Sequence, residues 1–368
     1  MGRLIALLLP CFLSAVAVAD CRPWPAWVAF RQAYVQADGR VIDRSLPDQP
    51  TVSEASAYAA FLALVADDRP TFYAIERWVL ANLAAGDLGA RLPAWRWGHR
   101  DDGHWDVIDA NSASDADLWL AYDFLEAGRL WGDTRLSALA RQLAMRILDE
   151  EVVRLDKVGL ILLPGPKGFL REGNRAVVNP SYAPPFVLSR LATIDSRYLE
   201  LADSHEQLLK NSIGYGFVPD WAEAVAGVGY QPIVGEDGRG SYNAIRVYLW
   251  LALSADSPAR RRAVEWLRPF VEQVPSDHLP EWFDPRTGLS GGVGGRAHIA
   301  ALLPFLKIVA PARYAALRAQ MNDEASIAPD GQRYYGDVLT LIALAADTGR
   351  YRFTLDGRLL RGRVPCHS

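Results

Sequence analysis

The sequence has few of the residues that usually build metal centres or reactive thiol sites. Its 368 residues include only three cysteines and six histidines. The cysteines form no C-x-x-C pair, and the histidines are scattered singly along the chain. The sequence indicates neither a serine nucleophile elbow nor a phosphate-binding G-x-x-x-x-G-K-[ST] loop. We therefore expect no metal and no cofactor, and nucleotide-dependent enzymes are poor candidates.

Charge of one sign is not in large excess, since 39 basic and 43 acidic residues give a formal charge of −4. This balance gives no reason to expect nucleic acid as a partner.

The longest apolar run spans residues 4–18, follows Arg3 and leads to small residues that end at Ala19. Such a segment is typical of a secretory signal peptide cleaved after Ala19. A membrane anchor is the alternative, but the run is short for a bilayer and Pro10 interrupts it.

We therefore expect residues 1–19 to be a signal peptide, and the mature protein to lie in the periplasm with no membrane span. Two cysteines would remain after cleavage, Cys21 and Cys366, one near each end. In an oxidising compartment we expect them to form a disulfide, with two unpaired thiols as the alternative. No shift in composition marks a domain boundary, so residues 20–368 are interpreted as one domain.

Apolar residues recur at helical spacing through most of the chain, whereas alternating strand patterns are scarce. The pattern predicts about twelve helices, near 24–36, 52–66, 70–84, 112–130, 135–151, 181–193, 196–211, 241–254, 257–274, 297–309, 311–321 and 334–347. Taken as six successive hairpins, they indicate a closed double ring of helices rather than a four-helix bundle. The linkers, rich in Gly, Pro, Asp and Trp, would then gather around a cleft.

Aromatic residues are abundant, with 12 Trp and 14 Tyr. Several lie in Gly/Pro-rich linkers: Trp95, Trp97, Trp105, Trp221 and Tyr182. A flat apolar ring beside hydrogen-bonding groups suits a sugar, because one side of a pyranose presents C–H bonds and its rim presents hydroxyls. The alternative is that these rings fill the core beneath long loops. As a group they favour a carbohydrate-binding surface.

Carboxylates stand at the start of two predicted helices. Glu54 opens one of them, and Asp115 and Asp117 open another. An acidic first turn usually stabilises the helix dipole. Two carboxyl groups facing each other across a cleft are also what glycoside hydrolysis needs, roughly 6.5 to 9.5 Å apart when the mechanism inverts the anomeric centre.

The run from Ala113 to Asp117, with Ala121 and Trp131 after it, resembles in outline the A-[ST]-D-[AG]-D signature of glycoside hydrolase family 8, with Leu120 as a conservative departure. Further similar stretches are Ser53-Glu54 before Tyr58, LPAWRWG at 92–98, NPSYAPP at 179–185, GFVPDW at 216–221 and SYNAIRVYLW at 241–250. Together they resemble the periplasmic endoglucanases encoded beside bacterial cellulose synthases.

This resemblance implies an (α/α)6 barrel and an inverting endo-β-1,4-glucanase that acts without a metal. Glu54 matches the general acid, and Asp115 matches the signature aspartate, which we expect to hold the distorted sugar. The implied partners are cellulose chains and the cellulose synthase export machinery. The implied substrate-binding residues are Tyr58, Trp95, Trp97, Asp117, Tyr182, Trp221, Tyr242 and Arg246.

The departure from the family is at Asn243, where the S-Y-D-A-I-R stretch of the family has the aspartate that takes a proton from the attacking water. An amide can orient a water but cannot accept its proton, and loss of general-base help costs typically 10²- to 10⁴-fold in rate. Three explanations remain open. The amide could be a substitution introduced to trap a substrate, another carboxylate could serve as the base, or the protein could bind glucan with little turnover. The candidate bases are Asp237, Glu236, Asp115 and Glu172.

Overall fold

The computed structural model describes residues 24–321 and 333–362. The predicted signal peptide, Cys21 and Cys366 lie outside the described residues, so the cleavage site and the disulfide stay predictions. In the described ranges, no helix combines the length and the apolar character that a membrane span requires.

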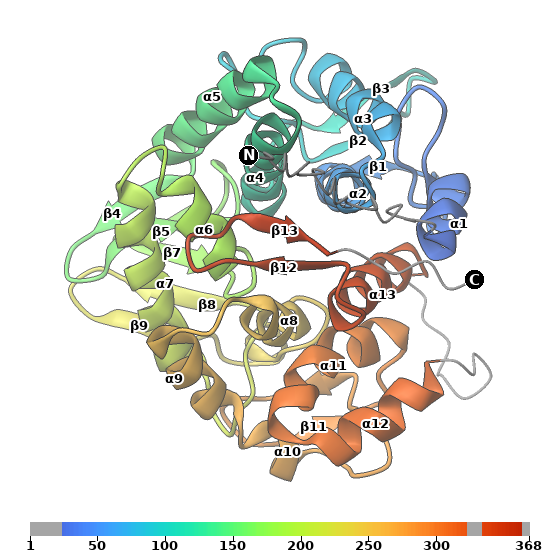
Figure 1. The fold of residues 1–368 in the computed structure, drawn as a ribbon. Coiled ribbons are helices and arrows are strands. Elements are labelled where there is room, and N and C mark those ends of the chain that lie inside the picture. Colours follow the sequence, from blue (N-terminus) through green and yellow to red (C-terminus); the bar gives the residue numbers. More distant parts are fainter. Residues whose placement is uncertain (1–23, 322–332, 363–368) are drawn as a thin grey trace, which may run out of the picture.

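Six helices form the inner ring of a barrel. They are α2 (Ser53–Ala66), α4 (Ser114–Trp131), α6 (Pro185–Leu191), α8 (Ile245–Leu253), α11 (Arg296–Val309) and α13 (Arg333–Asp347). Each inner helix contacts the next one, and α13 contacts α2, which closes the ring (Figure 1). The sequence of α2 shows why these helices are inside, because every residue from Ala55 to Val65 is buried. A helix that is apolar on all sides must be enclosed by other elements.

An outer layer of amphipathic helices covers this ring. It consists of α1 (Pro25–Tyr34), α3 (Arg69–Asn82), α5 (Thr134–Glu150), α7 (Arg197–Ser212), α9 (Pro258–Leu267) with the short α10 (Phe270–Gln273), and α12 (Pro311–Gln320). In α5 the buried residues Leu136, Ala140, Leu143 and Ile147 follow at intervals of three or four, so one face packs inward. Each outer helix contacts an inner helix next to it in sequence, or α13 and α2 in the case of α1. The predicted (α/α)6 barrel is confirmed.

Three predicted helices begin several residues later than expected or are broken in two in the structure. The segment 257–274 is broken into α9 and α10 at Pro269, because proline cannot donate the helical hydrogen bond and its ring clashes with the preceding turn. The segment 181–193 becomes helical only at Pro185. The segment 241–254 becomes helical at Ile245, so residues 241–244 form a turn that leads into α8.

Short antiparallel strands, which the sequence pattern did not reveal, lie in the connections. They are β1 (Thr51–Val52), β2 (Arg96–His99), β3 (Trp105–Asp109), β4 (Val152–Leu155), β5 (Gly159–Leu162), β6 (Leu170–Arg171), β7 (Arg175–Val178), β8 (Ala222–Val225), β9 (Gly229–Pro232), β10 (Trp282–Phe283), β11 (Ser290–Gly291), β12 (Tyr351–Phe353) and β13 (Leu359–Arg361). The larger sheets have the orders β1-β2-β3 and β6-β7-β8-β9. Strands of two to five residues are too short to show a clear alternation.

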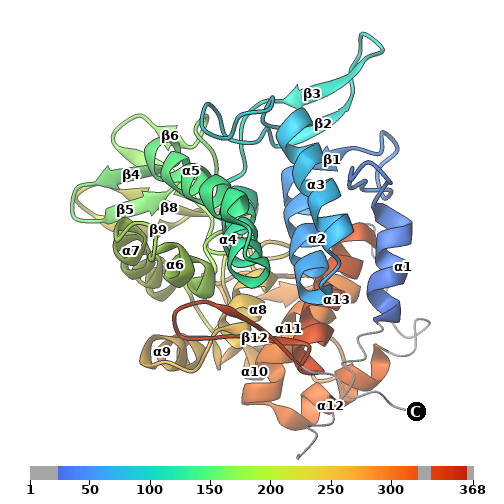
Figure 2. The same cartoon turned by 45° about the horizontal axis from the view of Figure 1, so that its top comes forward.

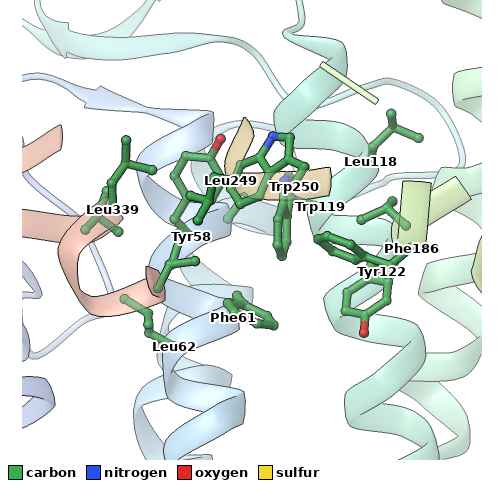
Figure 3. Close-up of a cluster of buried hydrophobic side chains, with 14 of the residues drawn as sticks. Tyr58, Phe61, Leu62, Leu118, Trp119, Tyr122, Phe186, Leu249, Trp250 and Leu339 are labelled. Carbon is green, nitrogen blue, oxygen red and sulfur yellow. The ribbon is translucent and has the colours of Figure 1, made fainter. Parts of the chain in front are cut away.

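Aromatic side chains fill the centre of the barrel (Figure 3). The rings of Trp119 and Trp250 have centroids 5.2 Å apart, and Phe61 packs edge-on against Trp119 at 4.9 Å. The β12–β13 hairpin packs against the middle of α4, where the Tyr122 hydroxyl donates to the carbonyl of Gly357 at 2.9 Å. This hairpin lies at the end of the barrel opposite the projecting β2–β3 hairpin (Figure 2). The N-termini of α2 and α4 are therefore at the end that the β12–β13 hairpin leaves uncovered.

Candidate active site

Glu54 occupies the first turn of α2. Strand β1 pairs with β2 and leads directly into this helix, which fixes the position of Glu54 next to the linker that carries Trp95. The indole Nε1 of Trp95 donates to Glu54 Oε1 at 3.2 Å. Burial, and then the nearby Asp115 carboxylate, raise the pKa of Glu54 to about 8. Glu54 therefore holds a proton at neutral pH, as a general acid must.

Asp115 forms a buried ion pair with Arg246. Only 2% of Asp115 is exposed, and its Oδ2 accepts a hydrogen bond from Arg246 Nη1 at 2.7 Å. The same Nη1 donates to the hydroxyl of Tyr58 at 2.9 Å. Burial raises the pKa of Asp115, while the Arg246 guanidinium opposes that rise. The geometry thus fixes one carboxylate beside Glu54 and keeps it oriented.

Asn243 lies in the turn before α8, and its amide is oriented by the same arginine. Arg246 Nη2 donates to Asn243 Oδ1 at 2.6 Å. Because a guanidinium has donors and no acceptor, the oxygen of the amide must face Arg246. The Nδ2 group is then the end that remains for other partners, and it can only donate. Asn243 can hold a water by donating to it from Nδ2, but it cannot take the proton of that water.

The carboxylates suggested as replacement bases are not grouped around Asn243. Glu236 and Asp237 are exposed in a short 3-10 turn, where Glu236 pairs with Arg239 at 3.5 Å. Glu172 is exposed between β6 and β7. Within the described residues, no hydrogen bond or ion pair connects these three side chains to Asn243. Asp115 is the exception, because it shares Arg246 with Asn243.

Asp220, which the sequence analysis did not select, lies beside the turn that carries Asn243. Its Oδ1 accepts the backbone N–H groups of Ser241 at 2.9 Å and Ala244 at 2.7 Å, on either side of Asn243. Burial raises the pKa of Asp220. The signal was present in GFVPDW, since Asp220 directly precedes Trp221 in a linker, but its contacts to residues more than twenty positions later could not be seen.

Three aromatic residues of the predicted set gather around Arg246 and the turn before α8. The Arg246 guanidinium lies 5.4 Å from the ring centroid of Tyr182, and Tyr182 meets Trp221 edge-on at 6.0 Å. Tyr242 packs against His298 at 4.7 Å. Together with Trp95, these rings give the site the aromatic walls that suit a sugar chain.

Three other predicted residues have different surroundings. Tyr58 is 2% exposed and supports Arg246 from the core. Asp117 is fully buried behind Asp115, where burial and the carboxyl of Glu151 raise its pKa well above the usual range. Trp97 contacts Trp78 and Trp105. The structure therefore brings Tyr58 to Arg246 from the buried side, whereas Asp117 and Trp97 lie away from the rings that surround Arg246.

One sequence pattern needs a correction. Residues 288–292, GLSGG, do match G-x-S-x-G, the motif of serine nucleophile elbows. In the structure this stretch is a turn that leads into β11, which pairs with β10, and not a strand-to-helix turn. Ser290 therefore lacks the setting of a catalytic serine.

Comparison with known proteins identifies the family of this barrel. The glycosyl hydrolases family 8 profile matches residues 1–349. The chain belongs to glycoside hydrolase family 8.

Two curated relatives resemble this family 8 chain over most of its length. An endoglucanase of Escherichia coli O157:H7 is 39% identical over 95% of this chain and 94% of its own length. An endoglucanase of Xanthomonas axonopodis pv. citri is 38% identical over 97% and 93%, respectively. Among solved structures, the endo-1,4-D-glucanase of Vibrio fischeri ES114 is 36% identical, with a TM-score of 0.84 over 92% of this chain and 99% of that one. The chain is thus a glycoside hydrolase.

Proposed function

We propose that this family 8 protein is an endo-β-1,4-glucanase that cleaves cellulose with inversion, in the periplasm and in the service of bacterial cellulose biosynthesis. The main support is the protonated Glu54 beside the Asp115–Arg246 ion pair, at the N-termini of α2, α4 and α8. The names of the relatives, endoglucanases, agree with this substrate class.

The proposed reaction begins with the leaving oxygen. Glu54 transfers its proton to the glycosidic oxygen while the bond between that oxygen and the anomeric carbon breaks. The Asp115 carboxylate, held by Arg246, accepts hydrogen bonds from hydroxyls of the distorted sugar. A water attacks the anomeric carbon from the opposite face, and one proton of this water must leave to a base.

Asp220 is the carboxylate that we propose as this base. Its hydrogen bonds from Ser241 and Ala244 both end on Oδ1, and the backbone N–H of Asn243 also interacts with the carboxylate, so Asp220 is held next to the amide that would orient the water. The Nδ2 group of Asn243 would donate to the oxygen of the water, and the proton of the water would pass to Asp220. The raised pKa of Asp220 makes it a stronger base than an ordinary aspartate.

A second candidate function is glucan binding with strongly reduced turnover, in support of cellulose export. The amide at Asn243 favours it, because the aromatic walls of the site do not need a base. The protonated Glu54 favours hydrolysis, since a protein that only binds glucan has no evident use for a general acid.

Release of reducing ends from carboxymethyl-cellulose separates the two functions. We expect activity in the wild type and its loss in Glu54→Gln, with Glu272→Gln on the exposed face of α10 as the matched control. No activity in the wild type and a clear gain in Asn243→Asp would instead establish the binding function. Equal activity in wild type and Glu54→Gln would refute the assigned acid.

The proposed location and biological role need their own tests. Mature protein recovered from an osmotic-shock fraction should begin at Asp20 if the signal peptide is cleaved after Ala19. A deletion strain should export less cellulose, and the wild-type gene should restore export. Recovery of the protein with residues 1–19 still attached in the membrane fraction would contradict the periplasmic assignment.

A further inference from the structure

We propose that Trp105 and Trp97 form a second binding site for β-1,4-glucan chains, separate from the catalytic site. The ligand class rests on the proposed function, whereas the site itself rests on the geometry of the β2–β3 hairpin. We call these two rings the tryptophan platform.

The tryptophan platform presents a large apolar surface to solvent. Trp105 is 48% exposed although it stacks on Trp97, with centroids 5.4 Å apart and ring planes inclined by 26°. Most exposed apolar residues in the described part of the chain are aliphatic, and Trp105 has the largest ring among them. The exposure also argues against the alternative that Trp105 only fills the core beneath a loop.

Buried neighbours hold the platform in place from below. The guanidinium of Arg40 lies 4.6 Å from the centroids of both rings, and Arg40 is only 8% exposed. Arg40 is itself fixed by its donations to Thr51 Oγ1 at 3.0 Å and to the carbonyl of Gln49 at 2.7 Å. A ring that is rigid before binding loses little conformational entropy when a ligand stacks on it.

Two cavities meet at the platform. One of about 470 Å³ and another of about 670 Å³ are both lined by Trp97 and Trp105. Gln36, Asp38 and Arg77 line the first cavity, and Asn111 and Lys167 are among the polar residues of the second. Hydrogen-bonding side chains thus flank the rings on two sides, as recognition of a sugar chain with hydroxyls along both edges requires.

The platform does not belong to the catalytic site. Neither cavity is lined by Glu54, Asp115 or the rings around Arg246. The β2–β3 hairpin projects from the barrel beside α3 (Figure 2), and Trp97 packs on Trp78 of that outer helix at 5.3 Å. A polymer long enough to reach both places could be held at the platform while another part of it occupies the catalytic site.

Binding to insoluble cellulose tests the platform in the full mature protein. The Glu54→Gln background prevents cleavage during the assay, and thermal unfolding checks that each variant is folded. We expect Trp105→Ala to bind cellulose about three- to tenfold more weakly, the effect of losing one aromatic face contact. Leu170→Ala, at a residue that is 52% exposed on β6, is the matched control and should bind normally.

Three outcomes would overturn the proposal. Unchanged binding of folded Trp105→Ala to cellulose would show that the platform takes no glucan. Weaker binding to xylan with unchanged binding to cellulose would show a different ligand class. A loss of cellotetraose hydrolysis in Trp105→Ala with Glu54 intact, compared with an active wild type, would place Trp105 in the catalytic site. A wild type without turnover would count against the proposed function alone, because the binding assay does not depend on hydrolysis.

Discussion

Replacement of Asn243 by aspartate is the most informative perturbation of the site. The substitution keeps the size of the side chain and places a carboxylate where Arg246 Nη2 now donates at 2.6 Å to an amide oxygen. A general base contributes typically 10²- to 10⁴-fold to the rate. The arginine would hold the pKa of the new carboxylate low, and a weaker base gives less help, so we expect a gain near the lower limit, about 10²-fold in kcat.

The ground-state contacts of the sugar should change little, because Asp115, Tyr182 and Trp221 keep their positions. We therefore expect KM on carboxymethyl-cellulose to stay within about twofold while kcat rises, which is the pattern of an interaction made mainly in the transition state. Asn211→Asp, at the exposed end of α7, introduces the same charge away from the site and should leave both constants unchanged.

A wild-type kcat that equals that of Asn243→Asp would refute this reasoning. It would show that Asp220 already supplies as much base catalysis in the wild type as a carboxylate at position 243 can. A large fall in KM with constant kcat would also contradict it, because that result would assign position 243 to substrate binding and not to the attacking water.

Three further predictions follow from the same carboxyl groups. The kcat/KM profile should decline on the alkaline side near pH 8 as Glu54 loses its proton, and this limb should shift to higher pH in Trp95→Phe, because the lost hydrogen bond favours the ionised form. Burial raises the pKa of Glu151 from 4.5 to about 8, so the contribution of Glu151 to the free energy of unfolding should be complete below pH 4.5 and fall by a few kcal/mol towards pH 8; denaturant unfolding of Asp117→Asn should show a flatter decline over this range, since the amide removes the raised titration of Asp117 itself. Asp220→Asn should lower kcat in the wild type but have little effect in the Asn243→Asp background, and equal losses in both backgrounds would show that Asp220 only supports the turn.

The fold was largely predictable because helical periodicity is a strong local signal. The bounds of α2, α5 and α7 differ from the predicted ones by only one residue at either end. The wrong prediction of one unbroken helix over 257–274 also has a local cause, because Pro269 breaks a helix and the periodicity alone does not take it into account. The short strands were missed because their pairing partners, and not their own sequences, define them.

Candidate site residues could be selected from the sequence where they lie in a family motif. They could not be selected where only tertiary contacts bring them to the site. Glu54 and Asp115 were selected from the family pattern, and the structure places their carboxyl groups close enough to interact. Asp220 was missed because its role depends on N–H groups that the fold brings to it. Trp95 and Trp97 are two positions apart and were assigned together, yet one donates to Glu54 and the other packs on the outer helix α3.

Arg246 explains how the amide at Asn243 can be accommodated without rearranging the site. Its guanidinium donates to Asp115, Tyr58 and Asn243 at the same time. A guanidinium N–H needs only an oxygen as its acceptor, and a carboxylate and an amide both have one. With an amide in place, the single carboxylate of Asp115 faces the charge of Arg246, which opposes the rise in the pKa of Asp115 that burial causes. Exchange of the base for an amide therefore removes a proton acceptor but preserves the arrangement that binds the sugar and the one that donates the proton from Glu54.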